Sequence, residues 1–405
     1  MKVLPCLILA LCELPTGWAQ ASPGAERRPA RFELSTEMLR FSEPSTELFL
    51  GWQRNVNSGI QVGMDALSGS LGLDQPDQQL ARGGLLAVAS GVSYVVNDAF
   101  SVTAHDQRHI ETARANGATS AGLVVGDSNR APLGIWLFFL KSFDFTREAG
   151  LYTYEMPAGM TDAQKAAVAG AGLDTTLLIA AETARKIDRG DGHIADLTPY
   201  LLNKLWGINY FMVTGSTSDA QNYMGFLQAQ GASTVTQQNV IRLQAASCLL
   251  SGGFLSLARG VWLYIADGNP KVQPLELDIE PARVFWPEIT TWLNGGSVSV
   301  QTTVDVAWDE NLFFLAGVDV PVLTTSQAAA EVTIGATVRI QVILVAAELT
   351  TNFAGMPFLL GNAQVAMDPR FSVGLQGYYG AGATMREVRE YPLGPGVTAF
   401  IRAAL

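Results

Sequence analysis

Cysteine is scarce in this chain, and its placement excludes two kinds of site. Only three cysteines occur among the 405 residues. Cys6 and Cys12 fall in an apolar run near the N-terminus, which leaves Cys248 alone in the remainder. A single thiol can form neither an internal disulfide nor a zinc site built from several thiolates. The folded part must therefore be held together by its core.

Charge is also scarce. Charged residues make up 16% of the chain, against roughly 25% in ordinary globular domains. The formal net charge of −11 would repel the phosphates of nucleic acids, so we expect no nucleic-acid partner. Few charges together with 48% hydrophobic residues indicate either a membrane partner or a very large core.

Long apolar runs and several catalytic motifs are missing as well. After the N-terminal segment, no stretch reaches 18 clean apolar residues; the best candidates, residues 83–97, 205–218 and 243–258, are short or interrupted by polar groups. Membrane helices around a polar site and buried helices of a soluble core share this composition, so both interpretations stay open. The chain has no G-x-S-x-G elbow and no P-loop, which disfavours serine hydrolases of that class and nucleotide binding by a P-loop.

The N-terminal segment has the order of features of a secretory signal. A single positive charge at Lys2 precedes the apolar run 6–12, and Ala19-Gln20-Ala21 supplies small residues for a signal peptidase. The run is far shorter than the about 20 residues of a permanent anchor. We therefore predict a cleaved signal peptide at residues 1–21. The expected location is the periplasm or cell envelope, with embedding in the membrane left open.

The rest of the chain predicts an α+β fold. We expect a linker with short strands at 22–78, a helical domain at 79–268 and an antiparallel β domain at 269–405. The expected helices are Leu80–Asn116, Ala131–Lys141, Asp162–Asp188, Leu197–Val213, Ser218–Gln230 and Val240–Ala266, with glycines at several of their ends. Apolar residues recur at a period of two at 298–308, 332–340 and 371–377, which predicts strands of a sandwich or a barrel-like sheet.

One constellation carries chemistry. The chain has three histidines, and His105 and His109 lie four apart on a predicted helix. This spacing places both imidazoles on one face, one turn apart, as a helix does when it offers two nitrogens to one metal ion. Asp98, seven residues earlier, lies near the same stripe and is a candidate ligand or a partner that orients an imidazole.

The run His105-Asp106-Gln107-Arg108-His109 resembles the HExxH motif of zincin metallopeptidases, over these five residues only. In that family two histidines bind zinc and the glutamate activates a water. The resemblance implies zinc as the cofactor, a peptide as the substrate and Asp106 as the base. Aspartate is one methylene shorter than glutamate, so the helix would have to sit closer to the metal.

A catalytic zinc site needs a third protein ligand. Glu182, on a largely apolar predicted helix, resembles the glutamate that one branch of zincins takes from a later helix. Asp174, eight residues earlier, lies on a broad common face with it, and His193 is a further candidate in what is expected to be a solvated, glycine-rich loop. Tyr223 could stabilise an oxyanion, although a capped helix start explains Ser218-Asp219-x-x-Asn222-Tyr223 more simply.

Two functions remain open from the sequence. The first is an exported, membrane-associated, metal-dependent hydrolase of peptide or envelope substrates. The second is a non-catalytic envelope protein in structure, assembly or transport, in which the histidines lie on a solvated helix face. The oligomeric state is open in both.

Overall fold

The computed structural model describes residues 30–42, 44–73, 75, 77–125, 128–129, 133–143, 151–212, 218–309, 311–324, 329–352, 357–368, 370–380, 384–391 and 394–404. The predicted signal peptide lies outside these residues. The helices are η2 (Glu37–Leu39), α2 (Thr46–Ser70), α3 (Gln79–Ala115), α4 (Leu133–Lys141), α5 (Asp162–Lys186), η3 (Ile187–Asp191), η4 (Ile194–Asp196), α6 (Leu197–Met212), α7 (Asp219–Ala229), α8 (Gln237–Leu250), α9 (Gly252–Asp267) and α10 (Met385–Glu390).

The strands form one large and one small antiparallel sheet. They are β1 (Arg31–Ser35), β2 (Thr119–Val125), β3 (Ser128–Asn129), β4 (Leu151–Glu155), β5 (Glu276–Ile279), β6 (Ala282–Phe285), β7 (Glu288–Asn294), β8 (Ser297–Ala307), β9 (Leu312–Thr324), β10 (Glu331–Ile340), β11 (Ile343–Thr351), β12 (Phe358–Asp368), β13 (Phe371–Tyr379) and β14 (Gly396–Ala404). The fold class is as predicted, helices followed by an antiparallel sheet.

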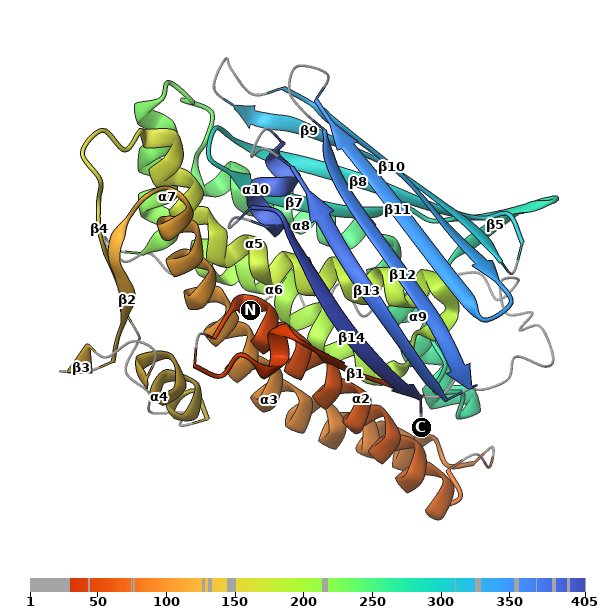
Figure 1. Ribbon diagram of the computed structural model, residues 1–405. Helices are drawn as coiled ribbons and strands as arrows, with labels where there is room; N and C mark the ends of the chain where they lie inside the picture. Colours follow the sequence, from red (N-terminus) through yellow and green to blue (C-terminus); the bar gives the residue numbers. More distant parts are fainter. Residues whose placement is uncertain are drawn as a thin grey trace.

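The large sheet covers one side of the helices (Figure 1). Its eleven strands run in the order β1-β14-β13-β12-β11-β10-β9-β8-β6-β5, and β7 pairs with β8 beside this path. Strand β1 comes from the N-terminal part of the chain, and its register joins Arg31 to Ala404 on β14. The sheet therefore unites both ends of the described chain. The small sheet, in the order β3-β2-β4, follows α3.

Helix α5 lies between the other helices and the large sheet. Thr161 and Gln164 form a capping box at its start, which satisfies free N–H groups of the first turn. The helix is rich in alanine and glycine, so neighbouring backbones approach closely. At Gly170, a Cβ would lie only 2.5 Å from the backbone oxygen of Leu293 on β7. Small residues thus let α5 pack directly on the sheet.

Two predicted elements differ from the structure. Phe32-Glu33-Leu34 lies in a strand as expected, but residues 46–70 form helix α2 instead of short strands. The side chain of Ser45 caps this helix by accepting a hydrogen bond from the N–H of Leu48. The predicted helix Val240–Ala266 is broken at Ser251, whose backbone is extended. The two halves, α8 and α9, meet at 53°.

The described helices include one that is long and apolar enough to cross a membrane, α3; the bent pair α8 and α9 would be a second if it is counted as one span. Length and composition alone support this, and the core helix of a soluble protein can meet the same criteria.

Candidate metal centre

The histidine pair lies in the enclosed half of α3. Every residue from Ala99 to Ala113 is buried, because α2, α5 and α6 and the small sheet surround this part of the helix. His105 is 4% exposed and His109 is fully buried. The solvated helix face considered from the sequence is therefore wrong. Two imidazoles taken out of water need partners that satisfy their nitrogens.

The orientation of His109 is set by α5. Its Nδ1–H donates a hydrogen bond to the carbonyl oxygen of Val168, at 2.5 Å. A neutral imidazole that donates through Nδ1 has its lone pair on Nε2. This Nε2 lies 3.1 Å from Nε2 of His105, so the two ring nitrogens face each other.

Aromatic side chains of α6 hold His105. Its ring stacks on Trp206, with centroids 5.6 Å apart at an angle of 26°, and meets Tyr210 edge-on at 5.7 Å. Gly172 of α5 leaves room for both imidazoles, since a Cβ there would overlap them. Residues of α5 and α6 thus fix the ring of His105.

Asp219 completes the cluster from the first residue of α7. Its Oδ2 lies 3.4 Å from Nε2 of His109 and 3.7 Å from Nε2 of His105. The hydroxyl of Tyr210 donates a hydrogen bond of 2.8 Å to the same oxygen. Burial alone would raise the pKa of Asp219, but the two imidazoles outweigh it and hold that pKa well below its ordinary value. The carboxylate is therefore ionised at neutral pH.

The three side chains match the geometry of one metal ion. His105, His109 and Asp219 each offer one ligand atom, and these atoms all lie within 4.8 Å of one another. Two ligands bound 2.0–2.1 Å from a tetrahedral zinc ion lie about 3.3–3.4 Å apart. The observed separations of 3.1, 3.4 and 3.7 Å bracket this value. The buried cluster could hold a metal ion with little rearrangement.

Asp106 follows His105 on α3 and is 8% exposed. Burial and the charge of Asp219 raise the pKa of Tyr210, and the charge of Asp106 adds to them. Asp106 thus contributes charge to the surroundings of the cluster, although it is not one of the three ligand residues.

Two of the residues predicted as ligands lie elsewhere. The carboxylate of Glu182 pairs with Arg54 of α2, with 3.0 Å between Oε2 and Nη1. Asp98 belongs to α3 but precedes His105 by seven residues, which is about 10 Å along a helix. Neither residue contributes to the cluster.

The remaining candidates have structural partners. Asp174 accepts a hydrogen bond of 2.7 Å from the backbone N–H of Leu293 on β7. His193 is buried rather than solvated: its Nδ1 accepts from the N–H of Ala195 and its Nε2 lies 3.3 Å from Asp65. The hydroxyl of Tyr223 donates to the backbone oxygens of Asn294 and Ser297, so it supports the sheet and does not face the cluster.

Asp219, Tyr210 and Gly172 escaped the sequence analysis. Asp219 is 110 residues from His109, so no local spacing links them. Its segment was noticed through Tyr223, and an acidic residue in the first turn of a helix has an ordinary explanation in the helix dipole. The role of Asp219 beside the histidines depends on the packing of α7 against α3 and α5, which the sequence does not reveal.

Comparison with protein-family models, with curated proteins and with solved structures finds no match to this chain in any of the three. The geometry of the cluster is therefore the basis of the functional assignment.

Proposed function

We propose that this protein is an exported zinc-dependent hydrolase whose metal is held by His105, His109 and Asp219. The observation that carries the proposal is the convergence of three buried ligand atoms at separations suited to one tetrahedral ion. Buried histidines with facing nitrogens and an ionised carboxylate are costly to assemble without a shared partner. A bound cation would supply that partner.

Each residue has a role in this proposal. The bond from His109 to Val168 fixes the tautomer that presents Nε2, as partners of metal-bound histidines commonly do. Tyr210 orients the carboxylate of Asp219. Three protein ligands are the usual number in catalytic zinc sites, where the fourth position holds a water whose pKa is lowered to about 7. Asp106 is the proposed general base that accepts a proton from this water.

Peptide is the proposed substrate class, and only the resemblance of the His-Asp-x-x-His run to the zincin motif supports it. The third ligand differs from the glutamate expected from that resemblance, because Asp219 comes from the start of a short helix.

The first experiment is elemental analysis of the purified protein after dialysis against zinc without chelators. We expect about one zinc per chain, and we expect it to be lost in the double variant His105→Ala/His109→Ala and in Asp219→Ala. Glu182→Gln and His193→Ala are matched controls, since they alter carboxylate or imidazole groups outside the cluster. Equal zinc in all five proteins, or none in any, would contradict the proposal.

A non-catalytic envelope protein is the second candidate. The observation in its favour is the apolar outer face of the large sheet, described below. In that case the zinc would remain, but no hydrolysis would depend on Asp106.

A further inference from the structure

The outer face of the large sheet is apolar across six neighbouring strands, β9 to β14. Exposed residues alternate with covered ones along most of these strands, except at the end of β10, where Val338, Arg339 and Ile340 are all exposed. The exposed large side chains carry no charge: Phe314, Val318, Val320, Val322, Ile334, Val338, Ile340, Ile343, Val345, Leu359, Val365, Met367, Phe371, Val373, Leu375, Tyr379, Val397 and Ile401. The exposed arginines of this part of the sheet, Arg339 and Arg370, lie at strand ends or turns.

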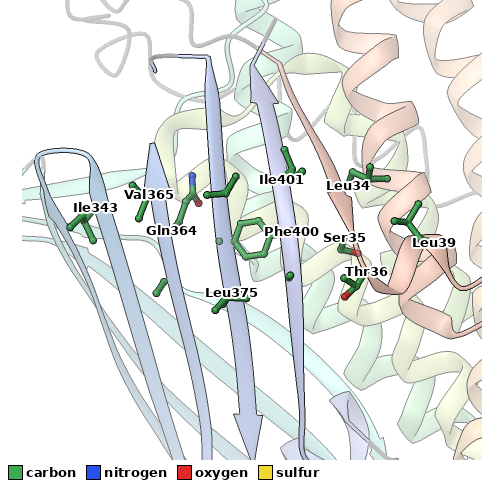
Figure 2. A pocket seen from close by; sticks show the side chains of 14 residues that line it. Leu34, Ser35, Thr36, Leu39, Ile343, Gln364, Val365, Leu375, Phe400 and Ile401 are labelled. Carbon is green, nitrogen blue, oxygen red and sulfur yellow. The ribbon is translucent and has the colours of Figure 1, made fainter. Parts of the chain in front are cut away.

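The strand register makes this face continuous. Paired residues place Ile343, Val365, Val373, Ile401 and Leu34 in one row across β11, β12, β13, β14 and β1. Figure 2 shows four of these side chains along adjacent strands, where all five contribute to a shallow and mostly apolar hollow. The apolar face is therefore one surface, not a scatter of single residues.

The inner face has the opposite character. Glu33 of β1 pairs with Arg402 of β14 at 2.7 Å. On the inner side α10 supplies Arg386, which is 1% exposed and lies 2.6 Å from the carboxylate of Glu348. Its neighbour Arg389 pairs with Asp319 of β9 at 3.1 Å. Charged groups thus point into the molecule and apolar groups point out.

This polarity is inverted relative to a sheet in water. An antiparallel sheet with one solvated face alternates apolar residues inward with polar residues outward. Strands that face lipid alternate apolar outward with polar inward. The described sheet follows the second pattern.

The edge at β1 is closed by a helix. Asn55 of α2 accepts a hydrogen bond from the N–H of Glu33 at 2.7 Å and donates one to its carbonyl oxygen at 2.6 Å. Ser58, one turn further, donates to the carbonyl oxygen of Arg31. Side chains of α2 therefore continue the hydrogen bonding that a further strand would provide.

Strand β7, which pairs with β8 beside the path that ends at β5, is also met by side chains of the helical part. The hydroxyl of Ser251 donates to the carbonyl oxygen of Ile289 at 2.8 Å and accepts from its N–H at 3.3 Å. Asp174 of α5 accepts from the N–H of Leu293. Free backbone groups at a sheet edge are not tolerated in hydrocarbon, and these contacts pair the backbone groups of Ile289 and Leu293.

The dimensions agree with a bilayer. Strands β9 to β14 have 9 to 13 residues, and a tilted strand needs about 9–11 to cross the hydrocarbon. Helix α3, on the other side of the molecule, is long enough to cross it as well. Its exposed large side chains, Leu80, Val88, Val92 and Tyr94, are also uncharged.

We propose that the outer face of β9 to β14 contacts the acyl chains of a lipid bilayer and that the chain is embedded there. Helices would form the rest of the surface that faces lipid. Helix α2 lies along β1, and helices α5 and α8 lie along β7, whereas β5 ends the strand order on that side (Figure 1). A lipid bilayer accounts together for this face, for strands of bilayer-spanning length and for the uncharged exposed side chains of α3, whereas a second copy or the residues before Ala30 would account only for the face itself.

The test uses spin labels on neighbouring residues of β13. Leu375→Cys places a label on the outer face, and Gln376→Cys, the matched control, places one on the inner face. Cys6, Cys12 and Cys248 are replaced by serine in both, and the full chain is reconstituted in phosphatidylcholine vesicles. We expect the label at residue 375 to collide with oxygen, which concentrates in lipid, several-fold more than with a water-soluble nickel chelate. At residue 376 this preference should be absent.

Three results would overturn the proposal. Preferential collision of the residue-375 label with the nickel chelate would place the face in water. Spin–spin coupling between residue-375 labels would identify a second copy as the occupant. If the collision rates of the residue-375 label changed only when residues 1–29 were removed, that segment would be identified as the occupant of the face. None of these outcomes alters the zinc content, so failure here is distinguishable from failure of the metal site.

Discussion

Gly172 of α5 lies against the imidazoles of α3 so closely that no side chain fits between them. A Cβ built at this position would be 2.6 Å from Nε2 of His105 and closer still to Nε2 of His109. Because Gly172 has no Cβ, the two ring nitrogens have room to face each other.

The substitution Gly172→Ala should therefore reorient at least one imidazole. We expect the zinc affinity to fall about 10–100-fold, as it does for changes that misalign a metal ligand, measured by competition with a chromophoric chelator. Gly225→Ala on α7 is the control, because no heavy atom lies within 4 Å of its added Cβ. Unchanged affinity in Gly172→Ala would show that the two imidazoles do not bind one ion.

Tyr210 offers a test of the third ligand. Its hydroxyl donates to Asp219 Oδ2, the oxygen nearest the histidines. Tyr210→Phe should lower zinc affinity about 10–100-fold while it keeps the ring that contacts His105. Tyr223→Phe removes another buried tyrosine hydroxyl, one bonded to the sheet, and should lower the melting temperature without changing the affinity. Equal effects of the two variants on affinity would indicate general loosening of the fold.

A substitution at Asp106 allows catalysis to be tested separately from metal binding. Asp106→Asn should retain about one zinc per chain, because its carboxylate is not among the three ligand groups. Loss of a general base costs typically 10²–10⁴-fold in rate, so peptide hydrolysis should fall by this amount. The measurement pairs zinc content with kcat on a peptide library. A variant that keeps both zinc and full activity would assign the base to another residue.

Acid should release the metal through the histidines alone. Zinc binds neutral imidazole, so protons compete with it as the pH falls from about 7 to 5. The pKa of Asp219 is held well below its ordinary value, so this carboxylate stays ionised across that range and adds no proton to the slope. Burial lowers the pKa of His105, whereas Asp219 outweighs burial and raises the pKa of His109, so His109 takes up its proton first. Apparent affinity should therefore fall by about tenfold per pH unit while His109 is protonated, and by up to about a hundredfold per unit once His105 is protonated as well. A slope of no proton, in a titration at constant ionic strength, would mean that neither histidine binds.

The order of helices and strands could be predicted because it depends on local pattern. Helix α5 begins at Asp162, as predicted, and the period-two stretch 332–340 lies in β10. Helix α2 was not predicted, since Glu47-Leu48-Phe49-Leu50 offers only a short apolar run, which does not distinguish a strand from the start of a helix.

Of the three residues of the site, only the two histidines, which are close in sequence, could be predicted. His105 and His109 lie one helical turn apart, so their spacing is visible in the sequence. Asp219 joins them through tertiary packing, and the alanine-rich helix that carries Glu182 gave no sign of the ion pair with Arg54. The inverted polarity of the sheet was also hidden, because alternation alone does not reveal which face is covered.

The buried ion pair of Lys204 and Glu288 gives a prediction for the fold. Nζ of Lys204 lies 2.6 Å from Glu288 Oε1, and Glu288 Oε2 accepts from the N–H of Gly253 at 3.1 Å. Helices α6 and α9 are thereby joined to β7. Glu288→Ala leaves an ammonium buried without its partner, which should lower the free energy of unfolding by about 3–5 kcal/mol. Thermal unfolding followed by circular dichroism would measure this loss.

The double variant Lys204→Met/Glu288→Leu is the control for that pair. It removes both charges and keeps much of the volume, so we expect it to be more stable than Glu288→Ala alone, since apolar replacement of a whole buried pair is often neutral. If the double variant were instead as unstable as the sum of Glu288→Ala and Lys204→Met, the two side chains would act independently. The connection between the helices and β7 would then depend on the hydrogen bonds of Ser251 rather than on the ion pair.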